Sequence, residues 1–162
     1  MQDGSNINLP GAEADEADAD INAVYHFFNE LGIMEQLVTT QLSHVLPASL
    51  NKSQFGVLNH MVRLGRLESP AQLASAFQVK RPSMTNTLQK LEAKGFVEIQ
   101  PNEADGRGKV VKITQQGIAA RAEALQALAP LFEKIRDDLG TELFEQARPL
   151  LERVRIYLDE NR

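Results

Sequence analysis

Two short helical patterns separated by only two residues constrain the fold of this chain most strongly. The first covers residues 69–77, where Ser69 is placed to cap a helix, Pro70 suits its first turn and Gln72 completes a capping box. The second covers residues 80–95, and only Gln78 and Val79 lie between the two. Two helices joined by so short a turn predict a helix-turn-helix unit.

The second of these helices has two chemically distinct faces. At about 100° per residue, Met84, Leu88, Leu91 and Gly95 share one side and predict a buried face. The exposed side carries Pro82, Ser83, Thr85, Asn86, Gln89 and Lys90. Amide side chains can bond adenine, hydroxyls can bond several base edges, and cations can bond guanine or phosphate. This side is a candidate DNA contact, and the alternative is an ordinary solvated helix face.

Charge is concentrated in segments that the net charge of -5 conceals. Residues 1–50 contain eight acidic side chains and no Lys or Arg, whereas residues 51–112 contain ten basic and five acidic ones. The field over a local patch steers a polyanion more than the total charge does. The middle segment is therefore compatible with nucleic acid binding, with a merely solvated basic surface as the alternative.

A β-hairpin is predicted directly after the second helix. The β-branched runs FVEIQP and KVVKIT are joined by NEADGRG, which contains an Asp-Gly turn signal. Arg107 and Lys109 lie at or near the predicted tip. A helix-turn-helix followed by a basic hairpin is the winged form of the motif, and such a wing can place an Arg in the minor groove of DNA.

Apolar residues at helical spacing predict further helices before this unit. Residues 21–46 form a long one, which Pro47 ends. A shorter helix follows, with Asn51 and Gln54 as a capping box and Gly65 at its close.

Two more helices are predicted after the hairpin. Thr114 is placed to cap the first, within which Pro130 predicts a kink or a short break. Gly140 with Thr141 predicts a stop and a new cap, and Pro149 predicts a bend in the last helix.

The terminal helices carry more apolar surface than the small winged unit could cover. A dimer interface made from both chain ends explains this surface, and a bundle within one chain is the alternative. The predicted fold class is mainly α with a small β-hairpin wing (α+β). We expect a disordered acidic tail at 1–20, a helical dimerisation region at 21–49 and 115–162, and a winged helix-turn-helix DNA-binding region at 50–114.

The segments LNKSQFGVL, SPAQLASAFQVKRPSMTNTLQKLEAKGFVE, NEADGRGKVVKIT and TQQG, in this order and spacing, resemble the MarR family of winged-helix transcriptional regulators. The resemblance covers residues 50 to about 122. It implies a homodimer, typically a repressor, with two winged lobes on a palindromic site in double-stranded DNA. One helix of each lobe would enter the major groove, and each wing would reach a minor groove.

The resemblance also implies which residues contact DNA. Family contacts carry over to Ser83, Thr85, Asn86 and Lys90 in the helix, to Arg81 and Pro82 at its leading end, and to Asp105, which orients Arg107 in the wing. Gln89 and Lys109, from the patterns above, complete the predicted set.

Two departures from the family pattern reduce the expected number of phosphate contacts. The family often has Arg where this chain has Ile99 and Gln100, and often a second Arg beside the wing Arg, which Gly106 and Gly108 flank here. Each phosphate that the protein does not neutralise lowers the salt dependence of binding by about 0.9 in logarithmic slope.

Family members commonly bind phenolic or other aromatic acids between the dimerisation region and the DNA-binding lobe. The candidate residues for a small-molecule effector site are Phe27, Phe28, Met34, His60 and Arg63. The alternative for aromatic residues at helical spacing is ordinary core packing.

Other function classes have less support in the sequence. A metal-responsive regulator would use His26, His44 and His60, but their spacing matches no metal motif and the chain lacks cysteine, so no metal site and no cofactor are predicted. No phosphate loop or catalytic motif favours an enzyme. A winged-helix module that binds only proteins stays an alternative.

The sequence also indicates where in the cell the protein is expected. No apolar run is long enough to span a bilayer, so no membrane partner is expected. The lack of cysteine favours a reducing, cytoplasmic location.

Overall fold

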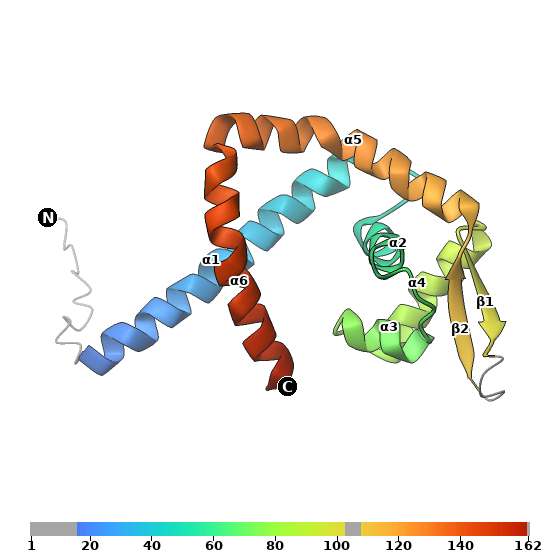
Figure 1. The fold of residues 1–162 in the computed structure, drawn as a ribbon, viewed down its shortest axis with the longest axis horizontal. Helices are drawn as coiled ribbons and strands as arrows, with labels where there is room; N and C mark the ends of the chain where they lie inside the picture. Colours follow the sequence, from blue (N-terminus) through green and yellow to red (C-terminus); the bar gives the residue numbers. More distant parts are fainter. Residues whose placement is uncertain (1–15, 103–107, 162) are drawn as a thin grey trace, which may run out of the picture. The chain divides into compact units, whose positions relative to one another are not determined.

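The computed structural model describes residues 16–102 and 108–161 (Figure 1). The chain divides into two compact units, Met1–Gln41 and Leu42–Arg162, and each is described by itself. The first unit contains most of helix α1 (Glu16–Val45). This helix begins within the segment predicted to be a disordered tail and ends two residues before Pro47. In the described part of the chain, no helix combines the length and apolar character that a bilayer crossing requires.

The second unit is mostly helical and contains one antiparallel hairpin. Its elements, in chain order, are α2 (Lys52–Leu64), α3 (Pro70–Ala76), α4 (Arg81–Ala93), β1 (Val97–Pro101), β2 (Lys109–Ile113), α5 (Gln115–Leu139) and α6 (Thr141–Glu160). Helices α2, α3 and α4 gather with the hairpin, and α5 leads away from its base (Figure 1). The mixture of helices and one hairpin confirms the predicted fold class.

Three predicted helix starts are capped by the predicted side chains. The Asn51 side chain accepts from the Gln54 amide at 2.9 Å, and the Asn51 amide donates back to the Gln54 side chain. Ser69 and Gln72 make the same reciprocal pair at the start of α3. The Thr114 hydroxyl accepts from the Gly117 amide at 3.0 Å and so caps α5. These bonds satisfy amides that lack partners within the first helical turn.

Of the predictions for the C-terminal helices, the cap at Thr141 was wrong. Thr141 is the first residue of α6 rather than its cap; Gly140 occupies the cap position with a φ of 78° and no side-chain bond. Helix α5 continues through Pro130 without a break, although its ribbon bends along its length (Figure 1). Helix α6 continues through Pro149, and the bend expected there stays a prediction. A Pro inside a long helix removes one backbone bond, and the surrounding turns hold the helix together.

One hydrophobic core holds α2, α3, α4 and the hairpin together. Met84, Leu88 and Leu91 are buried on α4, as the helical wheel predicts. Gly95 lies beyond the helix, is exposed, and takes a φ of 71°, so its assignment to the buried face was wrong. The core also contains Leu50, Val57, Leu58, Met61, Leu73, Ala74, Phe96, Val97, Val111, Ala120 and Ala124.

The hairpin is fastened to the helices at its base. Val97 pairs with Ile113 and Pro101 with Lys109 in an antiparallel register. The Val111 amide also donates to the Glu68 carbonyl at 2.9 Å, so the segment before α3 adds a bridge to β2. At the start of α5, a Cβ at Gly117 would overlap the Phe96 carbonyl, and glycine therefore allows this helix to sit against the hairpin.

Candidate nucleic-acid interface

The turn between α3 and α4 sets the direction of the proposed recognition helix. Gln78 has a φ of 52°, in the left-handed region that residues other than Gly rarely adopt. Its side-chain amide donates to the Ser75 carbonyl at 2.8 Å, and the Val79 backbone amide donates to the Ala74 carbonyl at 3.0 Å. These bonds close the C-terminus of α3, and the chain then turns into Arg81. Nothing in the sequence identified Gln78 as the left-handed residue.

The outer face of α4 is exposed and polar. The predicted contact residues on this helix are all exposed: Arg81, Pro82, Ser83, Thr85, Asn86, Gln89 and Lys90. Within the described residues, the Asn86 and Gln89 side-chain amides have no hydrogen-bond partner. An exposed amide with both donor and acceptor free can bond a base edge bidentately. The buried Met84, Leu88 and Leu91 hold this face outward.

A groove lies where the starts of α3 and α4 meet the hairpin. Its volume is about 620 Å³, and its lining combines helix-start residues with hairpin residues: Ser69, Pro70, Ala71, Gln72, Arg81, Thr85, Asn102, Gly108 and Lys109. The Asn102 amide donates to the Gly108 carbonyl at 2.8 Å and closes the hairpin side. Arg81 and Lys109 supply two cations, so the groove suits an anionic chain such as a nucleic acid backbone.

The structure places several residues of the predicted DNA-contacting set around one groove. Arg81, Thr85 and Lys109 line it together, although Lys109 lies 24 or more residues from the other two. Asp105 and Arg107 lie outside the described residues, and their wing contact stays a prediction.

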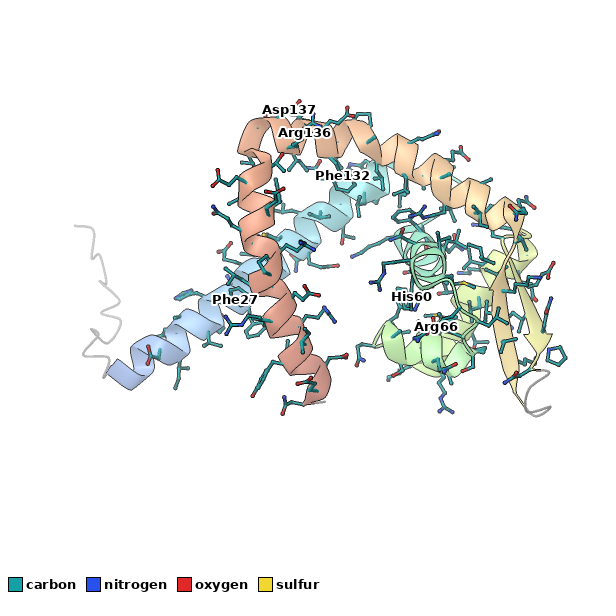
Figure 2. All side chains as sticks on the ribbon, viewed as in Figure 1. Phe27, His60, Arg66, Phe132, Arg136 and Asp137 are labelled. Carbon is teal, nitrogen blue, oxygen red and sulfur yellow. The ribbon has the colours of Figure 1, made fainter. Side chains whose placement is uncertain are left out.

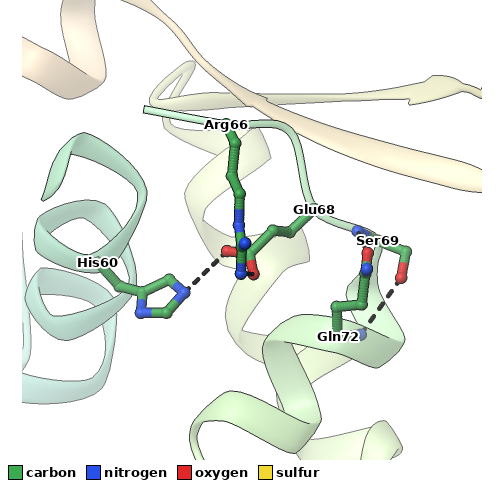
Figure 3. A network of polar contacts seen from close by, with 5 residues as sticks. All are labelled: His60, Arg66, Glu68, Ser69 and Gln72. Atoms are coloured by element: carbon green, nitrogen blue, oxygen red, sulfur yellow. Dashed lines mark hydrogen bonds and ion pairs between the residues drawn. The ribbon is translucent and has the colours of Figure 1, made fainter. Parts of the chain in front are cut away.

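A polar network around the buried Glu68, which the sequence did not indicate, lies beside the start of α3 (Figure 3). Glu68 is 5% exposed. Its carboxylate accepts from His60 Nε2 at 2.8 Å and from Arg66 at 3.1 Å. The His60 ring also packs edge-on against Phe77, with centroids 5.3 Å apart. Because Glu68 directly precedes Ser69 and bonds β2 through its carbonyl, the network links α2, the start of α3 and the hairpin.

Lys94, a cation of the basic segment, makes hydrogen bonds within the protein. Lys94 Nζ donates to the Ser49 carbonyl at 2.7 Å and to Gln54 Oε1 at 2.9 Å. These bonds tie the end of α4 to the start of α2. The basic residues of the segment 80–94 are therefore divided between an outward-facing group along the helix and one internal tie at its end.

The candidate effector residues fall in both units of the chain. Phe27 and Phe28 form an edge-to-face pair with ring centroids 5.4 Å apart, and both are exposed, as is Met34 (Phe27 is labelled in Figure 2). In the second unit, His60 is already bonded to Glu68, and Arg63 is exposed. The effector site stays a prediction.

Two of the histidines considered for metal binding make other contacts. The His26 ring packs edge-on against Tyr25, and His60 bonds Glu68. Among residues 16–102 and 108–161, no group of three or more metal-ligating side chains is present.

Comparison with known proteins identifies the winged region. Residues 48–108 match the model of the MarR family. A mutant MarR from E. coli, in complex with operator DNA, is 27% identical with a TM-score of 0.70 over 82% of this chain and 96% of that one. The transcriptional regulator BldR from Sulfolobus solfataricus is 25% identical with a TM-score of 0.70, over 82% of this chain and 97% of that one.

A further match extends the shared fold along almost the whole chain. A MarR protein from Peptoclostridium difficile is 18% identical with a TM-score of 0.71, over 98% of this chain and 97% of that one, which shows the fold alone. The family match over residues 48–108 and the structural likeness along most of the chain show that this protein has a winged-helix fold and that its winged region is similar to the MarR family of transcriptional regulators.

Proposed function

We propose that this protein is a homodimeric repressor that binds a palindromic DNA operator and is released from it by a small aromatic or phenolic ligand. The observation that carries the proposal is the outer face of α4, where the Asn86 and Gln89 amides are exposed on the helix whose first residue, Arg81, lines a groove with Lys109. The similar E. coli protein was crystallised with operator DNA, which supports the same use of this surface.

The chemistry of the surface assigns different tasks to its two kinds of side chain. Arg81 and Lys109 neutralise phosphates and position the duplex, while Asn86 and Gln89 bond base edges in the major groove. Phosphate contacts carry most of the affinity and its salt dependence, whereas base contacts carry the preference for one sequence.

Exposed apolar side chains on the terminal helices support the homodimer. Helix α6 has no buried residue, and Leu150 and Tyr157 are 58% and 65% exposed. Phe132 on α5, labelled in Figure 2, is also exposed. Apolar surface of this extent requires cover, and a second copy supplies it through a two-fold interface. A two-fold dimer presents two α4 helices and therefore matches a palindromic site.

Selection of bound DNA from a random pool tests the proposal. We expect the wild-type protein to enrich a palindrome, and Asn86→Ala to relax the base preference at one position in each half-site by about 1–3 kcal/mol. Lys134→Ala, which removes a cation from an exposed pair with Asp138 on α5, is the matched control and should leave the preference unchanged. Failure to enrich any palindrome would contradict the proposal.

Salt dependence separates the phosphate contacts from the base contacts. Lys109→Ala should lower the slope of log affinity against log salt by about 0.9 for each phosphate that is no longer neutralised, without changing the selected sequence. Anisotropy titrations at several salt concentrations measure this slope. An unchanged slope would remove Lys109 from the interface.

The effector part of the proposal has its own test. The exposed Phe27–Phe28 pair offers aromatic faces against which an aromatic ligand can pack. Aromatic carboxylates should raise the melting temperature and weaken DNA binding. If no member of a panel does either, ligand release is wrong while DNA binding can still stand.

A further inference from the structure

Thr85 on α4 differs from its neighbours because its hydroxyl group is already bonded. The hydroxyl donates to the Arg81 carbonyl at 2.9 Å, one helical turn earlier. A hydroxyl has a single hydrogen, so Thr85 has no donor left for a base. The adjacent Asn86 side-chain amide, in contrast, has no partner within the described residues.

The same bond fixes the direction of the Thr85 methyl group. A threonine side chain that bonds the carbonyl four residues earlier is held in one rotamer, because both branches leave the same Cβ. The residue is exposed and lines the groove together with Arg81 and Lys109. A methyl group is therefore held in place beside the two cations of the groove.

The base edges of DNA offer one matching partner for such a group. Most major-groove atoms are hydrogen-bond acceptors, which a hydroxyl without a free hydrogen cannot serve. Thymine alone presents a methyl group there, and threonine methyls contact it through apolar packing.

We propose that Thr85 is a specificity-determining residue that recognises a thymine in each half-site through methyl–methyl contact. This inference rests on the proposed function, in which α4 enters the major groove. It assigns to Thr85 an apolar role, in contrast to the hydrogen-bonding role that its residue type first suggests.

Replacing thymine by uracil removes only the methyl group from the DNA and tests the contact directly. On the site that the wild-type protein selects, each thymidine is replaced in turn by 2′-deoxyuridine. One position per half-site should weaken binding about fourfold, the decrease expected for one buried methyl group. Thr85→Ser, which keeps the hydroxyl, should weaken binding to the thymine site by a similar factor and abolish the sensitivity to uracil at that position.

Two control variants keep the result specific. Thr85→Val keeps methyl groups without the hydroxyl and should stay sensitive to uracil. Thr87→Ser changes the other threonine of α4, whose hydroxyl donates to the Ser83 carbonyl at 3.2 Å, and should also stay sensitive.

Each outcome decides the matter. If the wild-type protein binds its selected site equally well with uracil at every position, or if Thr85→Ser keeps the uracil penalty, the assignment of Thr85 is wrong while DNA binding stands. If the wild-type protein selects no DNA, the proposed function and this inference fall together.

Discussion

The winged lobe (α2, α3, α4, β1 and β2) and helix α6 both carry apolar residues at regular spacing, but only those of the lobe are buried. In the lobe, Leu58, Leu88 and Val111 come from three elements and are completely buried. Helix α6 repeats Leu, Phe and Val at three- and four-residue steps, yet none of its residues is buried. Apolar residues at this spacing therefore form a core in the lobe, where other elements cover them, and an exposed apolar surface on α6. The difference predicts separate responses to mutation.

The largest expected effect is a decrease in stability when the lobe core is truncated. Leu88→Ala removes a fully buried side chain and should lower the free energy of unfolding by about 2–5 kcal/mol. Urea denaturation followed by circular dichroism measures the change. The neighbouring exposed variant Gln89→Ala should stay within about 0.5 kcal/mol of the wild type. A comparable effect of both variants would mean that α4 is not anchored by this core.

A charge placed on α6 should break association while sparing the lobe. Leu150→Glu introduces a carboxylate at an exposed apolar position and should weaken the dimer by about a hundredfold, equivalent to about 2.7 kcal/mol. Sedimentation equilibrium measures the dissociation constant. Arg148→Glu changes the charge by more, but on the other side of the same helix, and should leave the dimer intact. If the two variants behave alike, α6 does not form the interface.

The buried carboxylate of the lobe should give a smaller effect. Glu68→Gln keeps the size of the side chain but removes the charge that accepts from His60 and Arg66, and should cost about 1–3 kcal/mol of unfolding free energy. Chemical denaturation at pH 7 is a sufficient measurement. Arg66→Ala is the control, because its side chain is 67% exposed and such pairs contribute about 1 kcal/mol or less. Equal decreases would show that the exposed Arg66, rather than the burial of Glu68, controls stability.

Local signals explain which parts of the fold the sequence predicted. Asn51, Ser69 and Thr114 cap helices where they were expected, because a cap depends on residues three positions apart. The same logic was wrong for Thr141, since Gly140 adopts a positive φ and takes the cap position itself. A helix start is predictable when one candidate cap stands alone and is ambiguous when two adjoin.

Contacts between distant segments account for what the sequence could not predict. Glu68 is buried because α2 supplies His60 and β2 supplies a backbone amide, and neither is near it in a sequence motif. Lys94 looked like part of a basic surface, but it bonds Ser49 and Gln54, which lie 45 and 40 residues away. The exposure of Asn86 on α4 was predictable, because a helical wheel of this one helix separates its buried side from its exposed side.

Helix α5 runs from the lobe to the apolar surface without interruption. Gly117, Ala120 and Ala124 pack into the lobe, whereas Phe132 and Leu139 near the other end are exposed. At about 1.5 Å per residue the helix is about 37 Å long, so a change of about 10° in its direction displaces one end by about 6 Å. Such a helix is a lever: in the proposed dimer, a small adjustment at the contact between copies would change the separation of the two α4 helices by more than the rise of one base-pair step. If the proposed dimer forms, the bend of α5 therefore governs which spacing of half-sites it can span.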